Sequence, residues 1–302
     1  MNNKVVIIGC GNVGMSYAYA LLNQSTNVQE LVLIDLNTKR VEGEVMDLNH
    51  CLAFAPTGMK IKVGKYSDCK DASIVMIAAG ANQNPGETRM DLIHKNASIF
   101  KTIVSDVMKS GFDGIFLVAT NPVDIMTHLT YKYSGLDKNK VIGSGTCLDT
   151  ARLRYILGEK LEINPKDINA FVMGEHGDSE FVLWSNANVG LKNIKEFLSE
   201  DILNKIEDDV KNAAYEIIDK KGATYYGIGV SLVKITNAIL NDENSILTIS
   251  SYDEENEIFV GGPTIINKDG AKERLFVKLN EIETTKMSNS LKIIKDEINS
   301  LE

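Results

Sequence analysis

The sequence has few cysteines, and their positions exclude the sites that cysteine commonly builds. None of the four forms a CxxC pair, and none stands near a histidine at the spacing of a zinc site. We therefore expect no metal centre and no disulfide framework, and we interpret the thiols as reduced groups of a cytoplasmic protein. The cysteines are Cys10, Cys51, Cys69 and Cys147.

A positive net charge and long hydrophobic runs are also absent. The formal net charge is -9, so the surface should repel nucleic acids and anionic membranes. No apolar stretch approaches the ~20 residues of a membrane-spanning helix, and the first run, residues 5–8, is too short for a signal peptide. We expect a cytoplasmic protein that binds neither nucleic acid nor membrane and that holds any anionic substrate with local arginines.

The first half of the chain alternates short apolar runs with helical patterns. Because the runs are continuously apolar, they suit strands that are buried on both faces of a parallel sheet. The order predicts a doubly wound α/β domain of the Rossmann type over residues 1–144. The runs occupy residues 5–8, 31–34, 61–63, 74–79, 115–119 and 141–142, and helical stretches include 13–23 and 92–109.

The pattern changes in the second half, which we expect to form an α+β domain for substrate binding and catalysis over residues 145–302. No low-complexity linker separates the halves, so we expect them to pack tightly. Helical stretches occupy residues 149–161, 199–220, 228–240 and 286–298, and strand-like runs occupy 170–173, 246–250 and 258–260.

A glycine-rich turn follows the first predicted strand and opens a helix. Its sequence, GCGNVG at residues 9–14, contains the glycines Gly9, Gly11 and Gly14 of the GxGxxG pattern. These glycines allow a tight turn and let the backbone approach a pyrophosphate at the helix N-terminus. Glycines also serve as ordinary turn residues, so the motif alone leaves dinucleotide binding open.

Asp35 strengthens the case for a dinucleotide. It ends the second predicted strand about 20 residues after Gly14, where a carboxylate accepts hydrogen bonds from the adenosine ribose. A carboxylate there would repel the additional phosphate of NADP, so we expect NAD; the alternative is a turn residue at a strand end. Arg40 is a complication because it could reach that phosphate, but we expect it to lie beside the adenosine.

Reduction of a ketone by a hydride needs a proton donor, positive charge at the carbonyl and an anchor for the substrate. His176 lies in the segment GEHGD, after a strand-like run and between glycines, and a histidine can exchange a proton near neutral pH. The alternative is a structural histidine, which is how we interpret His50, His94 and His128.

Asp149 and Arg152 share one face of a predicted helix. As a surface ion pair they would contribute well under ~1 kcal/mol. In the functional interpretation Asp149 accepts a hydrogen bond from His176 and favours its protonated form. Arg152 then binds a substrate carboxylate through two parallel hydrogen bonds.

Two further segments follow buried strands. Residues 80–89 form a polar loop that is either a plain surface loop or a mobile lid, whose Arg89 would reach the reacting carbonyl on closure. Asn121 follows the strand-like run 115–119, where it could donate to the carbonyl oxygen or simply cap the helix that begins near Pro122.

Six segments together resemble the L-lactate/L-malate dehydrogenase family, and among its members most closely the L-lactate dehydrogenases of Gram-positive bacteria. They are GCGNVG, GANQNPGETR, VATNPVD, GSGTCLDTAR, GEHGDSE and KKGATYYGIG, and they extend from the end of the first strand to residue 229. The resemblance implies an NAD-dependent enzyme that reduces pyruvate to (S)-lactate, and it implies a homotetramer.

The same resemblance assigns roles to single residues. It makes His176 the proton donor and acceptor, Asp149 its orienting carboxylate, and Arg152 the carboxylate anchor. It also makes Arg89 the arginine of the lid. Further substrate contacts are implied for Asn121 and Thr224, and further cofactor contacts for Val13, Tyr66, Gly80, Ala81, Ala119, Asn121 and Ser144.

Gln83 indicates which keto acid is reduced. Malate dehydrogenases of the family carry an arginine here, which pairs with the second carboxylate of oxaloacetate. Opposite the neutral Gln83 that carboxylate would be desolvated without a partner, at a cost on the order of a few kcal/mol. The alternatives are a malate or branched-chain 2-hydroxyacid dehydrogenase, and a module that binds NAD without turnover and would need neither His176 nor the two arginines.

The sequence leaves open whether an effector activates the protein. Relatives activated by fructose 1,6-bisphosphate carry an arginine and a histidine, which correspond to Arg154 and Asn169 in this chain. The first is retained and the second is replaced, so activation could be weak, lost or met by another anion.

Overall fold

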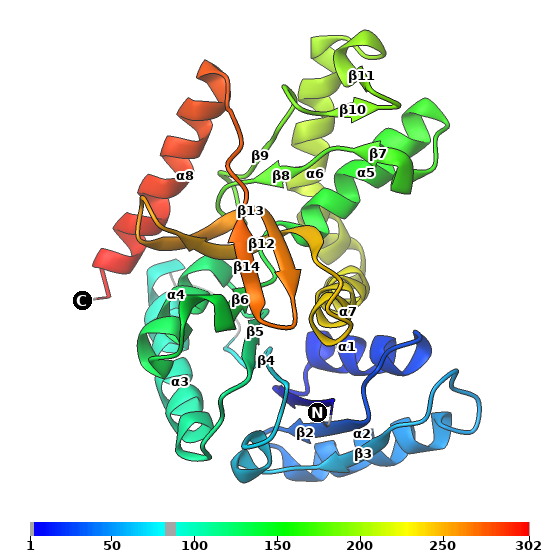
Figure 1. Cartoon of the computed structure of the whole chain (residues 1–302), viewed down its shortest axis with the longest axis vertical. Coiled ribbons are helices and arrows are strands. Elements are labelled where there is room, and N and C mark those ends of the chain that lie inside the picture. Colours follow the sequence, from blue (N-terminus) through cyan, green and yellow to red (C-terminus); the bar gives the residue numbers. More distant parts are fainter. Residues whose placement is uncertain (1–2, 82–88, 302) are drawn as a thin grey trace.

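The computed structural model describes residues 3–81 and 89–301. At its centre is a nine-stranded sheet in the order β14-β13-β12-β6-β5-β4-β1-β2-β3 (Figure 1). Its six N-terminal strands are parallel, as the predicted doubly wound fold requires, and the order in which they are added to the sheet reverses between β1 and β4. They are β1 (Lys4–Ile8), β2 (Glu30–Ile34), β3 (Lys60–Val63), β4 (Ile74–Ile77), β5 (Ile115–Val118) and β6 (Val141–Gly143).

Helices cover both faces of this sheet. Side chains of α1 (Asn12–Asn23), α2 (Thr38–Cys51) and α7 (Tyr226–Leu240) pack on one face against Val5 and Ile7. On the other face, α3 (Arg89–Lys109), α4 (Val123–Ser134) and α8 (Glu281–Asn299) pack against Val6 and Ile8. Successive residues of β1 therefore enter different cores, which explains why the strand is apolar throughout.

The second half of the chain extends the same sheet, which the sequence did not indicate. β12 (Ser245–Asp253) pairs antiparallel with β6, and β13 (Ile258–Asn267) and β14 (Gly270–Arg274) follow it as an antiparallel meander. The pairing of β12 with β6 joins Ser250 to Gly143, where a Cβ on the glycine would collide with Ser250 and Thr127. The predicted division between residues 144 and 145 lies between β6 and α5 (Cys147–Leu161) and stays a prediction.

The rest of the second half forms a smaller core between α5 and α6 (Glu200–Lys221), around Leu153, Leu157 and Val210. Of the run predicted as one strand at residues 170–173, only the last two residues form a strand, β8 (Val172–Met173), while β7 (Ile168–Asn169) ends just before the run, and the two strands belong to separate short sheets. One contains β7, β10 (Asn188–Val189) and β11 (Lys192–Asn193), and the other contains β8 and β9 (Phe181–Val182). Among the described residues, no helix has the length and hydropathy to cross a membrane.

Candidate active site

The turn between β1 and α1 uses its three glycines in two different ways. Gly9 has φ 101°, and a Cβ there would overlap the backbone of Ala79, while a Cβ on Gly14 would overlap the carbonyl oxygen of Gly9. These two glycines are therefore required by packing. A Cβ on Gly11 would meet no protein atom within 4 Å, and Gly11 has no side chain to cap α1. The helix N-terminus is thus open to an anion, as a pyrophosphate requires.

Asp35 lies beside this turn, directly after β2. Its Oδ2 accepts the backbone N–H of Cys10 at 2.7 Å, and its Oδ1 accepts that of Asn37 at 3.0 Å. The carboxylate is thereby fixed next to the glycines that precede α1. Arg40, in contrast, turns toward Glu44 of its own helix, with Nε 3.3 Å from Glu44 Oε1 and half of the side chain exposed.

The other expected cofactor contacts follow the carboxyl ends of the parallel strands. Gly80 and Ala81 follow β4, Ala119 and Asn121 follow β5, and Ser144 follows β6. Tyr66 begins the short 3-10 helix η1 (Tyr66–Cys69) after β3, and Val13 lies in the first turn of α1. Since all these strands are parallel, the residues lie along one edge of the sheet.

Asn96 of α3, which the sequence analysis did not single out, joins two of these strand ends. Its Oδ1 accepts the N–H of Ala81 at 2.8 Å, and its Nδ2 donates to the carbonyl oxygen of Asn121 at 3.1 Å. The side chain is almost fully buried. Asn96 therefore fixes the distance between the segments that follow β4 and β5.

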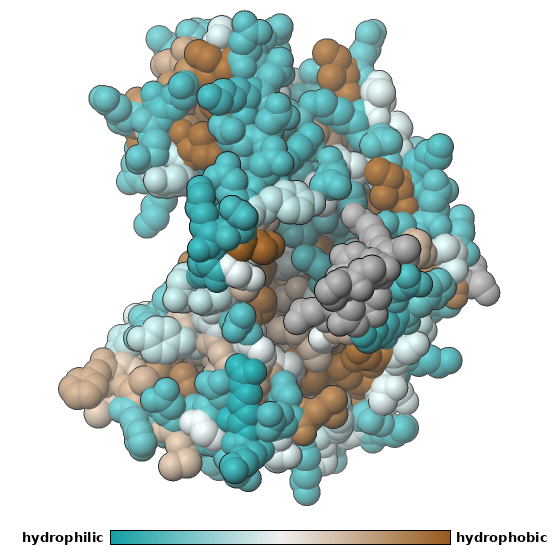
Figure 2. Space-filling view, turned by 180° about the vertical axis from the view of Figure 1, so that it is seen from behind, coloured by the Kyte–Doolittle hydropathy of each residue, from teal (hydrophilic) through white to brown (hydrophobic). Residues whose placement is uncertain are grey.

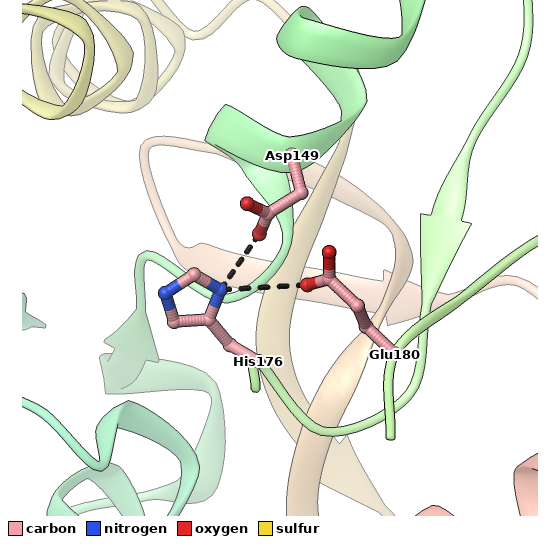
Figure 3. A group of neighbouring side chains, drawn as sticks. All are labelled: Asp149, His176 and Glu180. Atoms are coloured by element: carbon pink, nitrogen blue, oxygen red, sulfur yellow. Dashed lines mark hydrogen bonds and ion pairs between the residues drawn. The ribbon is translucent and has the colours of Figure 1, made fainter. Parts of the chain in front are cut away.

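His176 meets Asp149 as the sequence predicted, although 27 residues separate them. Nδ1 of the imidazole lies 2.6 Å from Oδ2 of Asp149, which projects from the first turn of α5 (Figure 3). The carboxylate is 1% exposed and the imidazole 24% exposed, so the pair lies at the boundary between protein and solvent. Asp149 also accepts Nη1 of Arg152 on its other oxygen, at 2.7 Å.

The main chain of His176 is held by a second buried carboxylate, Asp124 of α4. Asp124 Oδ2 accepts the N–H of His176 at 2.8 Å, and Oδ1 accepts the hydroxyl of Ser250 in β12 at 2.5 Å. Burial raises the pKa of Asp124 to about 6, although both hydrogen bonds oppose the shift. Asp124 ends the segment VATNPVD, and nothing in the sequence pattern predicted a role for it.

Glu180 is a third carboxylate at the site, and the sequence analysis missed it. Its Oε2 lies 3.7 Å from Nδ1 of His176, on the same ring nitrogen that contacts Asp149 (Figure 3). The side chain is 4% exposed. Only its place four residues after the histidine could have pointed to it, and that is a weak signal outside a helix.

His176, Asp149 and Glu180 change one another's pKa values. Burial by itself would lower the pKa of His176, but Asp149, and after it Glu180, outweighs burial and raises that pKa well above its usual value. Burial would likewise raise the pKa of Asp149, yet the imidazole outweighs it and the pKa is lowered. For Glu180 burial dominates and, together with Asp149, raises the pKa to about 8.

The structure leaves several predicted positions without a test. Gln83 lies outside the described residues, and Arg89 is described only as the first residue of α3. Thr224 lies in the segment that joins α6 to α7. At the candidate effector site, Arg154 donates Nε to the carbonyl oxygen of Ala170 at 3.1 Å, and Asn169 is exposed on β7.

Comparison with known proteins gives matches over nearly the whole chain. Residues 3–143 match the family model of the lactate/malate dehydrogenase NAD binding domain, and residues 146–302 match that of the lactate/malate dehydrogenase alpha/beta C-terminal domain. The chain is 50% identical to L-lactate dehydrogenase 2 of Bacillus cereus, covering 97% of this chain and 96% of the relative. It is 53% identical to the L-lactate dehydrogenase of a Geobacillus strain, covering 97% and 95%.

Solved structures agree with the sequence matches. MGS-M5, a lactate dehydrogenase enzyme from a Medee basin deep-sea metagenome library, superposes with a TM-score of 0.97 at 52% identity, covering 100% of this chain and 99% of that one. The ligand-bound minor L-lactate dehydrogenase of Enterococcus mundtii gives 0.98 at 44% identity, with coverage of 100% and 99%.

Proposed function

The chain belongs to the lactate/malate dehydrogenase family, and we propose that it interconverts pyruvate and (S)-lactate with NAD as the hydride carrier. The family, the fold class and the NAD cofactor that the sequence predicted are confirmed by the two matching domains. The contact between His176 and the buried Asp149 is the observation that carries the proposed chemistry.

That contact defines which imidazole nitrogen exchanges the proton. Nδ1 keeps its hydrogen in the bond to Asp149, so Nε2 is the atom that gives a proton to the carbonyl oxygen of pyruvate and recovers it from lactate. Bound NADH supplies the hydride that reduces the carbonyl carbon. The negative charge of Asp149 stabilises the imidazolium, so His176 is charged when pyruvate arrives.

Arg152 is suited to hold the substrate carboxylate. It uses Nη1 for Asp149, and its guanidinium retains further N–H donors for a second, two-pronged contact. Because one oxygen of Asp149 binds the anchor and the other binds the proton donor, the carboxylate fixes the distance between them. A 2-keto acid bound through its carboxylate would thus present its carbonyl to the imidazole.

The turn before α1 and Asp35 fit the cofactor. The open space at Gly11 and the uncapped helix N-terminus suit the pyrophosphate, and the fixed carboxylate of Asp35 suits ribose hydroxyls. The same carboxylate would repel the additional phosphate of NADP. Arg40, which contacts Glu44, does not compensate for that repulsion.

We further propose that pyruvate is preferred over oxaloacetate because Gln83 offers no charge to a second carboxylate. We expect kcat/KM for pyruvate to exceed that for oxaloacetate by orders of magnitude, and Gln83→Arg to reverse the order. Equal rates on both substrates would reject Gln83 as the discriminating residue and leave a malate or broader 2-hydroxyacid dehydrogenase as the better description.

We also propose a cytoplasmic homotetramer. Support comes from large apolar side chains at the surface, which commonly mark an interface between subunits. Leu36, Phe54, Leu191 and Phe276 are each more than nine-tenths exposed. The lower half of the face in Figure 2 carries many apolar side chains, whereas its upper half is mainly hydrophilic. Sedimentation at micromolar concentration should give four times the mass of 33.2 kDa.

The direct test of the activity follows absorbance of the reduced nicotinamide after protein, NADH and pyruvate are mixed. We expect the absorbance to fall, and to fall several orders of magnitude more slowly with His176→Asn, which should still bind NADH. A protein that binds NADH and leaves the absorbance unchanged would instead be an NAD-binding module without turnover.

A further inference from the structure

Glu180 shares with Asp149 the nitrogen of His176 that does not face the substrate. Its Oε2 lies 3.7 Å from Nδ1, too far for a good hydrogen bond but close enough for a strong charge interaction. The proposed proton transfer needs one carboxylate at Nδ1, and Asp149 supplies it. Glu180 is therefore a buried titratable group that the mechanism does not yet use.

Burial makes the ionised form of this second carboxylate unfavourable unless a nearby cation compensates its charge. Its side chain is 4% exposed, and a carboxylate without water is stable only when it is protonated or paired with a cation. Among the described residues, the imidazolium of His176 is the one cation that forms an ion pair with it. Below its own titration Glu180 is neutral and acts on His176 weakly, and above it Glu180 becomes a second anion beside the ring.

The other ionisable groups at the site already have different partners. On α5, Arg152 pairs with Asp149, and on α4, Asp124 accepts the main chain of His176 and the hydroxyl of Ser250. In the loop of His176 itself, Glu175 accepts the hydroxyl of Ser179. The exposed Asp178 of the same loop accepts the hydroxyl of Tyr215 on α6. Only Asp149 and Glu180 form ion pairs with the ring of His176 among the described residues.

We propose that Glu180 is a positioning residue of the reaction: its buried carboxylate, 3.7 Å from Nδ1, keeps His176 charged and so extends pyruvate reduction to higher pH. The inference rests on the proposed function, because His176 must be the proton donor for the effect to reach the rate. The raised pKa of Glu180, about 8, means that this carboxylate ionises in the range where an imidazolium would otherwise lose its proton.

The test compares Glu180→Gln with the unmodified enzyme over pH 6 to 9. Glutamine has the shape of the protonated acid, so kcat/KM for pyruvate at pH 6 should stay within about twofold. On the alkaline side the fall in kcat/KM should begin about one pH unit earlier, giving a roughly tenfold deficit at pH 9. Asp178→Asn, which removes a carboxylate from the same loop but not from Nδ1, should leave the profile unchanged.

The experiment distinguishes success of the proposal, failure of the proposal and failure of the proposed function. An equal deficit at every pH would reduce Glu180 to a structural role and overturn the proposal, as would a profile that coincides with that of the unmodified enzyme. Failure of the unmodified enzyme to oxidise NADH with pyruvate at any pH would instead overturn the proposed function.

If Glu180→Gln does not fold, the unmodified enzyme can be labelled with 15N-histidine. The imidazole shifts of His176, assigned with His176→Asn, should then titrate in two steps rather than one. A single step would overturn the proposal.

Discussion

Replacing Asp149 by asparagine keeps the shape of the side chain and removes its charge. The substitution acts on both contacts of the carboxylate, which lie 2.6 Å from His176 Nδ1 and 2.7 Å from Arg152 Nη1. At an effective dielectric constant of about 20, unit charges at the first separation attract by roughly 6 kcal/mol. A neutral hydrogen bond retains about half the strength of a charged one, which leaves a loss of about 3 kcal/mol.

That loss corresponds to a fall in kcat/KM for pyruvate on the order of a hundredfold at pH 7. Steady-state kinetics measures it, and fluorescence titration with NADH should show unchanged affinity, since Asp35 and the glycine turn are not altered. Asp178→Asn is the matched control and should keep full activity. If Asp149→Asn retained kcat/KM within threefold between pH 6 and 9, the charge on Asp149 would not be what stabilises the imidazolium.

Three further predictions follow from the geometry. Gly14→Ala should destabilise the protein by several kcal/mol in urea unfolding because its Cβ overlaps a carbonyl oxygen, whereas Gly11→Ala should fold normally and lose NADH affinity; the reverse result would contradict the roles given to these glycines. His176 has a raised pKa in the folded state, so its stabilising contribution is complete below about pH 6.5 and declines as pH rises through the folded-state value. The excess unfolding free energy of the unmodified enzyme over His176→Asn should therefore shrink in alkaline buffer, and a constant excess would refute the assignment. Fructose 1,6-bisphosphate should lower KM for pyruvate less than about twofold, because Asn169 offers no charge where activated relatives carry a histidine; clear activation would show that Lys166 or Lys234, which line a pocket together with Arg154, replaces it.

The parallel part of the fold could be predicted because its inner strands are buried on two faces. Val5 and Val6 enter opposite cores, so the run had to be continuously apolar, and such runs are visible in a sequence. The pairing of β12 with β6 could not be predicted. Antiparallel strands in the second half would have the same local pattern in a sheet of their own, and only the close approach of Ser250 to Gly143 decides between the two arrangements.

The candidate active site likewise contains contacts that the sequence predicted and contacts that it did not. The contact between His176 and Asp149 was predicted because two distinctive motifs supplied groups with complementary chemistry. Asn96 and Asp124 were missed because each acts through a long-range contact that no spacing encodes. Glu180 was missed because a position four residues after His176 is a weak signal outside a helix. The assignments of Gln83 and Arg89 remain predictions, since the first residue lies outside the described structure and the side chain of the second is not described.

The continuous sheet restricts how the enzyme can be divided or recombined. A fragment that ended after β6 would leave the main-chain N–H and C=O groups of that strand exposed, which is a template for aggregation. It would also deprive Asp124 of the hydroxyl donated by Ser250. A chimera that joined the N-terminal half to another relative's C-terminal half would have to match both the strand pairing and this hydrogen bond. We therefore expect the two halves to fold together and to tolerate recombination only when they are exchanged together.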